Sequence, residues 1–176
     1  FITSAKEQSI QVCLDLKARY PGKKVIVLGC LVQRYGRKLR EALAELDGFV
    51  GLGDTVGLLE LLGAGRSAPP GQRRRFLSYP GSAYLKVAEG CSNHCRYCAI
   101  PLIRGELVSR SREEILGEFH ELLAQGIFEL NLVAQDLASF GLDRGKPELG
   151  RLLEQISSVS GQFWIRLLYL HPDRFP

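Results

Sequence analysis

The chain has 176 residues, of which 45% are hydrophobic and 24% charged, a composition typical of a folded globular protein. No apolar run approaches the roughly 18 residues that a membrane-spanning helix needs, and the first residues lack the pattern of a signal peptide. Five cysteines, an odd number, fit metal binding in a reducing compartment better than a disulfide framework. We therefore expect a cytoplasmic protein without membrane contact. Because the sequence starts at Phe1 and contains no methionine, we also expect a fragment of a longer protein.

The first 62 residues predict alternating helices and strands. The spacing of Ile10, Cys13 and Leu14, with Leu16 as a further candidate, predicts a helix from residue 4 to residue 20. On this apolar face Cys13 is expected to be a small buried hydrophobic residue. The next elements are a buried strand (25–28), a helix (33–46), a short strand near 49–50, and a helix to residue 62 with Asp54 as its cap. This order is typical of an α/β domain with a parallel sheet.

Residues 63–82 are rich in Gly, Pro, Ser and Arg and predict a linker. A second domain, 83–176, begins with a strand at 84–87 and has further strands at 130–133 and 163–168. One intervening helix opens at a capping box of Ser111 and Glu114 and closes at Gly126, and the other runs from residue 149 to about residue 158. The order β-α-β-α-β predicts the first units of a right-handed βα barrel, truncated before closure.

Charge differs between the two halves of the chain. Residues 1–82 carry 13 Lys or Arg against 7 Asp or Glu, and residues 83–176 carry 10 against 12. A basic half can indicate contact with RNA or a ribosome. Solvated helix positions and the short run Arg73–Arg75 explain much of the excess, and we favour this simpler interpretation.

Three cysteines follow the first strand of the second domain in the run CSNHCRYC. Cys91, Cys95 and Cys98 have C-x3-C-x2-C spacing, with Tyr97 directly before the third. Three thiolates can hold three irons of a [4Fe-4S] cluster and leave the fourth iron open to a small molecule. The pattern resembles the signature of the radical S-adenosylmethionine (radical SAM) enzymes. The resemblance implies that SAM chelates the open iron and yields a 5'-deoxyadenosyl radical, which abstracts hydrogen from unactivated carbon.

A structural zinc site with His94 as the fourth ligand is an alternative interpretation of the same residues. It is disfavoured because His94 directly precedes Cys95, so both side chains would have to turn toward one metal. With zinc, the chain would be a binding module without catalytic activity, and its basic linker would contact the partner.

Polar residues follow the other two strands of the second domain. Gln135 and Asp136 come directly after one strand, and Arg166 and His171 lie near the end of the other. The carboxyl ends of parallel strands meet at one edge, so these side chains are candidates for binding the polar groups of SAM. Each has a structural alternative. Gln135 and Asp136 can cap a turn, Arg166 can form a salt bridge, and a histidine before Pro172 is often a local structural feature.

Longer runs narrow the resemblance to the methylthiotransferases, a branch of the radical SAM enzymes: YLKVAEGCSNHCRYCAIPLIRG, SRSREEI, LVAQD, FWIRLLYLHPD and, in the first domain, VIVLGCLVQRYG. The resemblance implies a partial amino-terminal α/β domain at 1–62 and the first β-α units of a partial TIM-type barrel at 83–176. It also implies that Cys30 is one of three ligands of a second [4Fe-4S] cluster, the other two lying upstream of Phe1. With those ligands and the rest of the barrel absent, the fragment alone is expected to be inactive.

Two types of methylthiotransferase compete. The RimO type modifies the β-carbon of an aspartate in a small-subunit ribosomal protein, and the MiaB type modifies an adenosine of transfer RNA. LVAQD and YLHPD resemble the RimO type, since the MiaB type is expected to have Gly-Gln-Asn in place of Ala134, Gln135 and Asp136. In both types the resemblance implies that SAM is used twice, as methyl donor and as radical source, with an electron donor as a further partner.

Overall fold

A computed structural model describes residues 2–64 and 80–174. The chain divides into two compact units, Phe1–Gln72 and Arg73–Pro176. Most of the predicted linker, including the run Arg73–Arg75, lies outside the described residues. In the part of the chain that is described, no helix is both long and apolar enough to cross a membrane.

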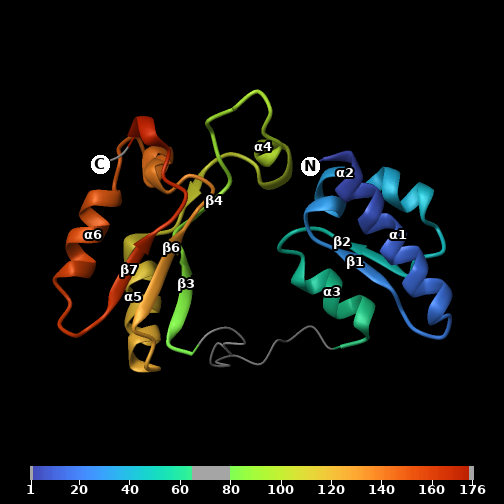
Figure 1. Ribbon diagram of the computed structural model, residues 1–176, viewed down its shortest axis with the longest axis horizontal. Coiled ribbons are helices and arrows are strands. Elements are labelled where there is room, and N and C mark those ends of the chain that lie inside the picture. The colour runs from blue at the N-terminus through green and yellow to red at the C-terminus, as the bar shows by residue number, and fades with distance from the viewer. Residues whose placement is uncertain (1, 65–79, 175–176) are drawn as a thin grey trace. The chain divides into compact units, whose positions relative to one another are not determined.

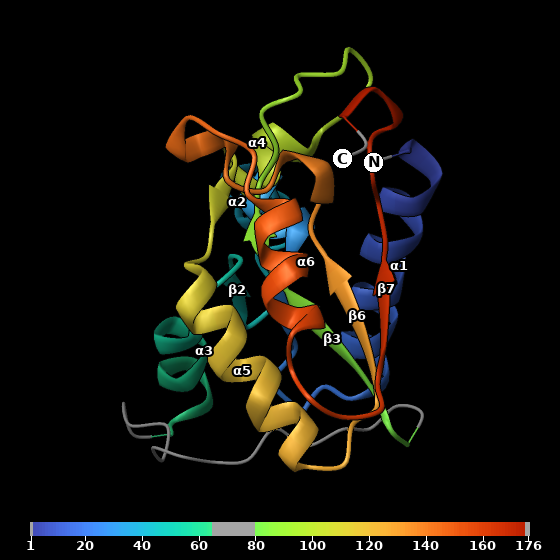
Figure 2. The ribbon, with the colours of Figure 1, turned by 90° about the vertical axis from the view of Figure 1, so that its left-hand side faces the viewer.

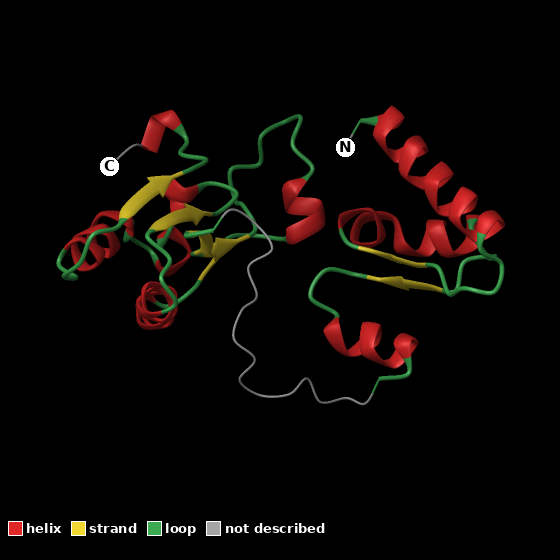
Figure 3. Cartoon of the chain, turned by 60° about the horizontal axis from the view of Figure 1, so that its bottom comes forward, coloured by secondary structure: helices red, strands yellow, loops and turns green. Residues whose placement is uncertain are grey.

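The described residues of the first unit, 2–64, form three helices and two short strands: α1 (Thr3–Arg19), β1 (Ile26–Leu28), α2 (Cys30–Ala42), β2 (Gly48–Val50) and α3 (Thr55–Leu62). The two strands pair in parallel, as predicted. Helices α1 and α2 lie on one side of this pair and α3 lies on the other (Figures 1 and 3). The side chain of Asp54 accepts a hydrogen bond from the backbone N–H of Gly57 at 2.9 Å, which confirms the predicted cap of α3.

Three residues of the predicted apolar face of α1 reach the core of this unit. Ile10, Cys13 and Leu14 pack against a cluster of side chains from α2 and the turn after it: Val32, Leu39, Leu43 and Leu46. The expectation for Leu16 is wrong, because 43% of its surface is exposed. The strand β1 is also less buried than predicted, since Leu28 is 61% exposed.

Helix α2 begins three residues earlier than predicted. Gly29 has a φ of 104° at the N-cap, a conformation that glycine adopts without the steric cost of a side chain, so the chain turns from β1 into the helix at once. Cys30 is therefore the first helical residue. The helix ends at Ala42, and Leu43 leaves the helical conformation with a φ of −129° and a ψ of 51°.

The second unit is built on three parallel strands, β3 (Ser82–Lys86), β6 (Glu129–Val133) and β7 (Trp164–Leu167), with β6 in the centre. Helices α5 (Arg112–Ala124) and α6 (Leu149–Ser157) connect them and cover the same face of the sheet (Figure 2). The predicted β-α-β-α-β order and its parallel pairing are thus confirmed. The capping box is also present, because Ser111 accepts from the N–H of Glu114 and Glu114 accepts from the N–H of Ser111.

The two faces of this sheet differ. Leu85, Leu130 and Leu132 are fully buried in the main core, together with large side chains of the two helices, which include Ile115, Phe119, Leu152 and Ile156. Alternation along the strands sends their neighbours to the other face. In register across the sheet, that face carries Tyr84, Asn131 and Arg166.

Several short elements were not predicted. Strands β4 (Ala88–Glu89) and β5 (Val108–Ser109) form an antiparallel pair, and helix α4 (Ile100–Arg104) lies between them in sequence. The described part of this unit, 80–174, also contains three 3-10 helices: η1 (Leu137–Ser139), η2 (Leu142–Arg144) and η3 (Pro172–Arg174). Elements of two to five residues are too short to show a hydrophobic period, so pattern analysis does not detect them.

Candidate metal and cofactor site

The three cysteines lie on a loop that leaves β4 and returns through α4 to β5. Two hydrogen bonds close the neck of this loop. The N–H of Cys91 donates to the carbonyl of Gly105 at 3.1 Å, and the N–H of Leu107 donates to the hydroxyl of Ser92, also at 3.1 Å. The loop therefore leaves and re-enters the fold at one point, directly after β4.

Gly90 occupies the tightest point of the neck. Its φ is 73°, and a Cβ built on it would lie 2.0 Å from the carbonyl oxygen of Glu106. That oxygen belongs to the backbone, so a side chain at position 90 could be accommodated only by moving the chain. The glycine before Cys91 is thus required by the close approach of the two sides of the loop.

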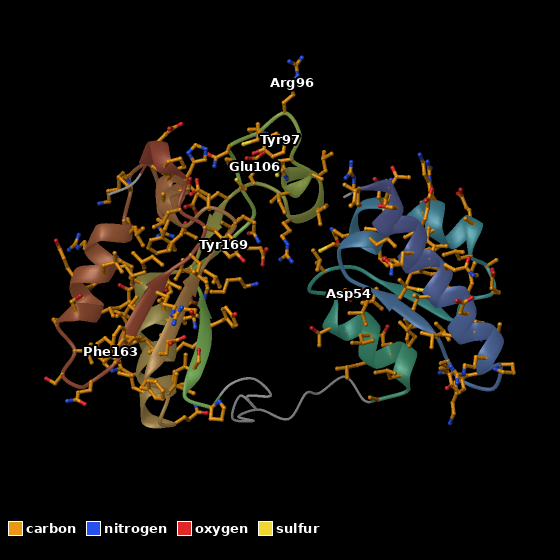
Figure 4. The ribbon with its side chains drawn as sticks, in the orientation of Figure 1. Asp54, Arg96, Tyr97, Glu106, Phe163 and Tyr169 are labelled. Atoms are coloured by element: carbon orange, nitrogen blue, oxygen red, sulfur yellow. The ribbon has the colours of Figure 1, made fainter. Side chains whose placement is uncertain are left out.

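The three thiols share one cavity. Cys91, Cys95 and Cys98 all line a space of about 290 Å³, and a backbone hydrogen bond of 2.9 Å from Cys98 to the carbonyl of Cys95 turns the third cysteine back toward the second. The cavity is also lined by Asn93, Tyr97 and Ile100, from the cysteine loop and the start of α4. Its other lining residues follow β6 or β7: Gln135, Asp136, Tyr169, Leu170, His171 and Pro172. It thus lies where the carboxyl ends of the parallel strands meet. Figure 4 shows Tyr97 and Arg96 at the outer end of the loop, with Arg96 directed away from the unit.

The chemistry of this donor set fits an iron–sulfur cluster with an open iron. Soft thiolates are the usual protein ligands of such clusters, and the other polar groups at the wall are an amide, a carboxylate and an imidazole. Within the described residues, however, no three His, Cys, Asp or Glu side chains converge closely enough to hold a metal ion as they stand.

The zinc alternative finds little support at His94. His94 is not among the described residues that line the cavity; its Nε2 lies 3.3 Å from a carboxylate oxygen of Glu106. Its φ of 48° falls in the left-handed region. Among the described residues other than glycine, only His94 and Tyr169 have a positive φ; His94 lies in the cysteine loop, and Tyr169 lines the cavity. Such backbone strain is concentrated at functional sites.

Asp136 connects three segments at the edge of the sheet. Its Oδ2 accepts hydrogen bonds from Asn93 Nδ2 at 2.8 Å and from Ser139 Oγ at 2.5 Å. Its Oδ1 accepts from the backbone N–H groups of Ala138 at 3.1 Å and His171 at 3.3 Å. Asp136 thus forms the cap of η1 that the structural alternative predicted, and it also contacts the cysteine loop and the segment after β7.

The carboxylate of Asp136 is held in its ionised form. The residue is only 4% exposed, and burial by itself raises the pKa of a carboxyl group. The hydrogen bonds from Ser139, Asn93, His171 and Ala138 outweigh burial, so the pKa of Asp136 lies below its ordinary value. An ionised carboxylate accepts stronger hydrogen bonds than a neutral one, which favours all four contacts.

The neighbouring residue, Gln135, has a side-chain oxygen without a hydrogen-bond partner, in contrast to Asp136. Its side chain lines the cysteine cavity, yet its Oε1 is buried and has no hydrogen-bond partner. A buried polar atom without a partner costs free energy, so such an atom at a cavity wall is a candidate contact for a bound ligand. Gln135 is also shared with a second cavity.

The second cavity, of about 530 Å³, adjoins the first. The two have three residues in common, Ile100, Gln135 and Tyr169. The remaining described lining comprises Tyr84, Lys86 and Val133, from the sheet face opposite the helices, and Ala134, which directly follows β6 and belongs to the main core. Lys86 is the one charged side chain in this described lining, and its Nζ lies 2.5 Å from Glu89 Oε2.

The structure separates the remaining candidate residues. His171 lines the cysteine cavity, where its backbone N–H binds Asp136 and its Nδ1 accepts from the N–H of Asp173 at 3.4 Å. Arg166 is not among the described residues lining either cavity. Its guanidinium instead lies 3.2 Å from Glu129 at the other end of β6, which is the salt bridge that the sequence left open.

The other two cysteines belong to the first unit. Cys30 begins α2, and within the described residues it forms no metal-binding group with other His, Cys, Asp or Glu side chains. Cys13 packs against the core, and burial raises the pKa of its thiol. All five cysteines lie within the described residues, and none is in a disulfide.

Several lining residues were not predicted from the sequence, among them Lys86, Asn93, Ile100 and Tyr169. Asn93 and Lys86 gave a usable signal, because Asn93 stands between two cysteines and alternation along β3 puts Lys86 on one face with Tyr84. Ile100 and Tyr169 gave none, because an isoleucine in an apolar run and an exposed tyrosine look ordinary in sequence.

The chain is similar over its whole length to curated methylthiotransferases. A ribosomal protein uS12 methylthiotransferase RimO of Treponema denticola is 40% identical across 100% of this chain and 44% of its own length. Those of Carboxydothermus hydrogenoformans and Syntrophomonas wolfei are 42% and 43% identical, across 99% and 98% of this chain and 43% of their own lengths. The chain thus spans less than half the length of these relatives. No family model matches it.

Proposed function

Because this chain belongs with the RimO-type methylthiotransferases over the whole of its length, we propose that the protein replaces a hydrogen on the β-carbon of an aspartate in ribosomal protein uS12 with a methylthio group. The observation that carries this proposal is the cavity shared by Cys91, Cys95 and Cys98 at the carboxyl ends of parallel strands. Chemistry in βα folds is concentrated at that end of the strands.

The three thiolates would bind three irons of a [4Fe-4S] cluster, and SAM would occupy the fourth. When bound, the cluster and SAM would supply the one-electron chemistry that breaks an unactivated C–H bond, which no side chain supplies. The amide of Gln135, with its unpartnered buried oxygen, would bind a polar group of SAM. His171 would complete the polar wall of the same cavity.

The second cavity would receive the target side chain. It shares Gln135 and Tyr169 with the cysteine cavity, so a side chain entering it would lie next to the bound cofactor. The ammonium group of Lys86 at its wall suits an acidic side chain. This charge fits the aspartate of a ribosomal protein better than the uncharged adenine ring of transfer RNA, and the relatives' names favour the same choice.

Residues 1–62 would belong to the amino-terminal domain of a methylthiotransferase and residues 83–176 to its radical SAM core. Cys30 would contribute to a second [4Fe-4S] cluster together with ligands supplied from outside this chain. A reducing electron donor is required for the radical step, and the thiols would stay reduced in the cytoplasm.

Electron paramagnetic resonance (EPR) of the anaerobically reconstituted and reduced chain tests the cofactor part. We expect a [4Fe-4S]⁺ signal that changes when SAM is added, because SAM binds the open iron. Cys95→Ala should abolish the change, and Cys30→Ala should leave it intact. Stoichiometric zinc without iron or sulfide in the anaerobically isolated chain would instead establish the zinc alternative.

Mass spectrometry tests the substrate. Deleting the gene in its host should remove the mass of one methylthio group from the uS12 aspartate and leave the modified adenosines of transfer RNA unchanged. The reverse result would make transfer RNA the substrate.

A further inference from the structure

We propose that Asp136 is a positioning residue for the cysteine loop and does not contact SAM. Its hydrogen bond to Asn93, here called the Asn93–Asp136 clasp, ties the stretch between Cys91 and Cys95 to the end of β6. The clasp joins residues 43 positions apart. It therefore fixes where the first two thiols stand relative to the strand ends.

The acceptor capacity of Asp136 is already filled. An ionised carboxylate has about four lone-pair sites. Two donors bind each oxygen, the backbone groups of Ala138 and His171 at Oδ1 and the side chains of Asn93 and Ser139 at Oδ2. A ligand would have to displace one of these donors. Gln135, whose buried Oε1 has no partner, needs no such displacement, so the two adjacent residues divide positioning and ligand contact between them.

The clasp connects the loop to a distant strand end, whereas the other hydrogen bonds described for the loop join residues of the loop to one another. The bonds from Cys91 to Gly105 and from Leu107 to Ser92 close the neck, and the bond from Cys98 to Cys95 lies within the loop. Between residues 91 and 99 the chain forms no helix or strand. The clasp instead connects the middle of this irregular stretch to a different strand end.

Asp136 is itself held rigidly. It is 4% exposed, and the segment after it is joined to the segment after β7 by a second bond, from the N–H of Leu137 to the carbonyl of Tyr169 at 2.9 Å. The left-handed backbone of Tyr169, with a φ of 62°, is kept in place by these contacts. Because this carboxylate is fixed, its hydrogen bond restricts the position of Asn93, as is required of a group that orients metal ligands.

Hydrogen–deuterium exchange of the metal-free full chain, read by peptide mass spectrometry, tests the clasp directly. Asn93→Ala removes the donor, so the amides of residues 91–98 should exchange about tenfold faster. Ser139→Ala is the matched control, because it removes another donor from the same oxygen and leaves the clasp intact. It should change exchange in 91–98 by less than about twofold. Peptides containing Cys13 or Cys30, in the other unit, should be unaffected by either change.

EPR of the reconstituted chain provides the second measurement. Asn93→Ala and Asp136→Asn should both broaden the [4Fe-4S]⁺ signal before SAM is added, because the thiols are less well fixed. The EPR measurement rests on the proposed function, because it requires the three thiols to bind a cluster. The exchange measurement does not. If the unaltered chain gave no cluster signal, the proposed function would fail, whereas the exchange result would still decide the clasp.

Two outcomes would overturn the inference. One is unchanged exchange of residues 91–98 in Asn93→Ala. The other is an Asp136→Asn chain with slow exchange in 91–98 that has lost the SAM-dependent change in its spectrum, since Asp136 would then be a ligand contact. If Asp136→Asn does not fold, Asn93→Ala decides alone.

Discussion

Glu89 and Arg104 lie on opposite sides of the cysteine loop, and their side chains meet, with Arg104 Nη1 2.5 Å from Glu89 Oε1. Glu89 ends β4 and Arg104 ends α4, so this side-chain contact joins the two ends of the loop. The backbone hydrogen bond from Cys91 to Gly105 joins the same two ends. Glu89 also contacts Lys86. Burial alone would raise the pKa of Glu89, but the bonds from Lys86 and Arg104 outweigh it and the pKa is lowered.

Arg104→Ala should destabilise the second unit by about 1 kcal/mol, the upper end of the range for partly exposed ion pairs. The change also leaves the loop open on one side. Denaturant unfolding measures the loss. Arg96→Ala is the control, because Arg96 belongs to the same loop and points away from the unit (Figure 4). Equal effects of the two changes would show that the contact with Glu89 contributes nothing.

Two glycine-to-alanine changes should have opposite signs. Gly90→Ala forces a Cβ against the carbonyl oxygen of Glu106 and should cost at least about 2 kcal/mol of unfolding free energy. Gly117→Ala lies within α5 with nothing within 4 Å of the new Cβ, and should stabilise by up to about 1 kcal/mol. Thermal unfolding of the two variants checks both signs. A harmless Gly90→Ala would mean that the neck of the loop is looser than described.

Gln135→Leu should separate stability from ligand binding. The change removes a buried polar atom that has no partner, so stability should stay the same or rise by about 1 kcal/mol. The SAM-dependent change in the EPR spectrum should be weakened or lost, because the amide is the proposed contact. Such opposite effects are typical of residues kept for function. Reduced stability with unchanged SAM binding would assign Gln135 a structural role instead.

Asp143 should make the second unit sensitive to acid. Burial alone would raise the pKa of its carboxyl group, but bonds from the hydroxyl and N–H of Ser109, at 2.6 and 2.9 Å, outweigh it and lower the pKa. A carboxyl with a lowered folded pKa contributes stability above its unfolded pKa of about 3.9, and the contribution is lost as pH falls through the folded value. The stability difference between the wild type and Asp143→Asn should therefore be constant near neutral pH and shrink below about pH 4. A constant difference down to pH 2 would contradict this.

Local signals predicted most of the fold. Ser111 and Glu114 identify the start of α5 because the capping box is formed by residues three apart, and Asp54 does the same for α3. Parallel pairing followed from the order of strands and helices. The end of α2 and the exposure of Leu28 could not be predicted in this way, because they depend on how the whole unit packs.

The candidate site was predicted in part. The order of strands correctly placed Gln135, Asp136 and the three cysteines at one cavity, and the role of the cysteines as cluster ligands stays a prediction. The partner of Asp136 could not be predicted, since Asn93 lies 43 residues away and the contact depends on the path of an irregular loop. Arg166 follows the same strand pattern, yet its side chain turns to Glu129. The position of a residue along a strand fixes its Cα, whereas a long side chain such as that of Arg166 can reach a partner away from the strand end.

The wall formed by Ile100, Gln135 and Tyr169 borders both cavities, and this has a thermodynamic consequence. A molecule that shifts the wall from one side changes the room available on the other. Free-energy linkage makes that influence mutual, so whatever factor one occupant imposes on the affinity of its neighbour is returned unchanged. Where such a shift occurs, the two cavities bind their ligands as a coupled pair, and the order of binding affects the rate of assembly without altering its total free energy.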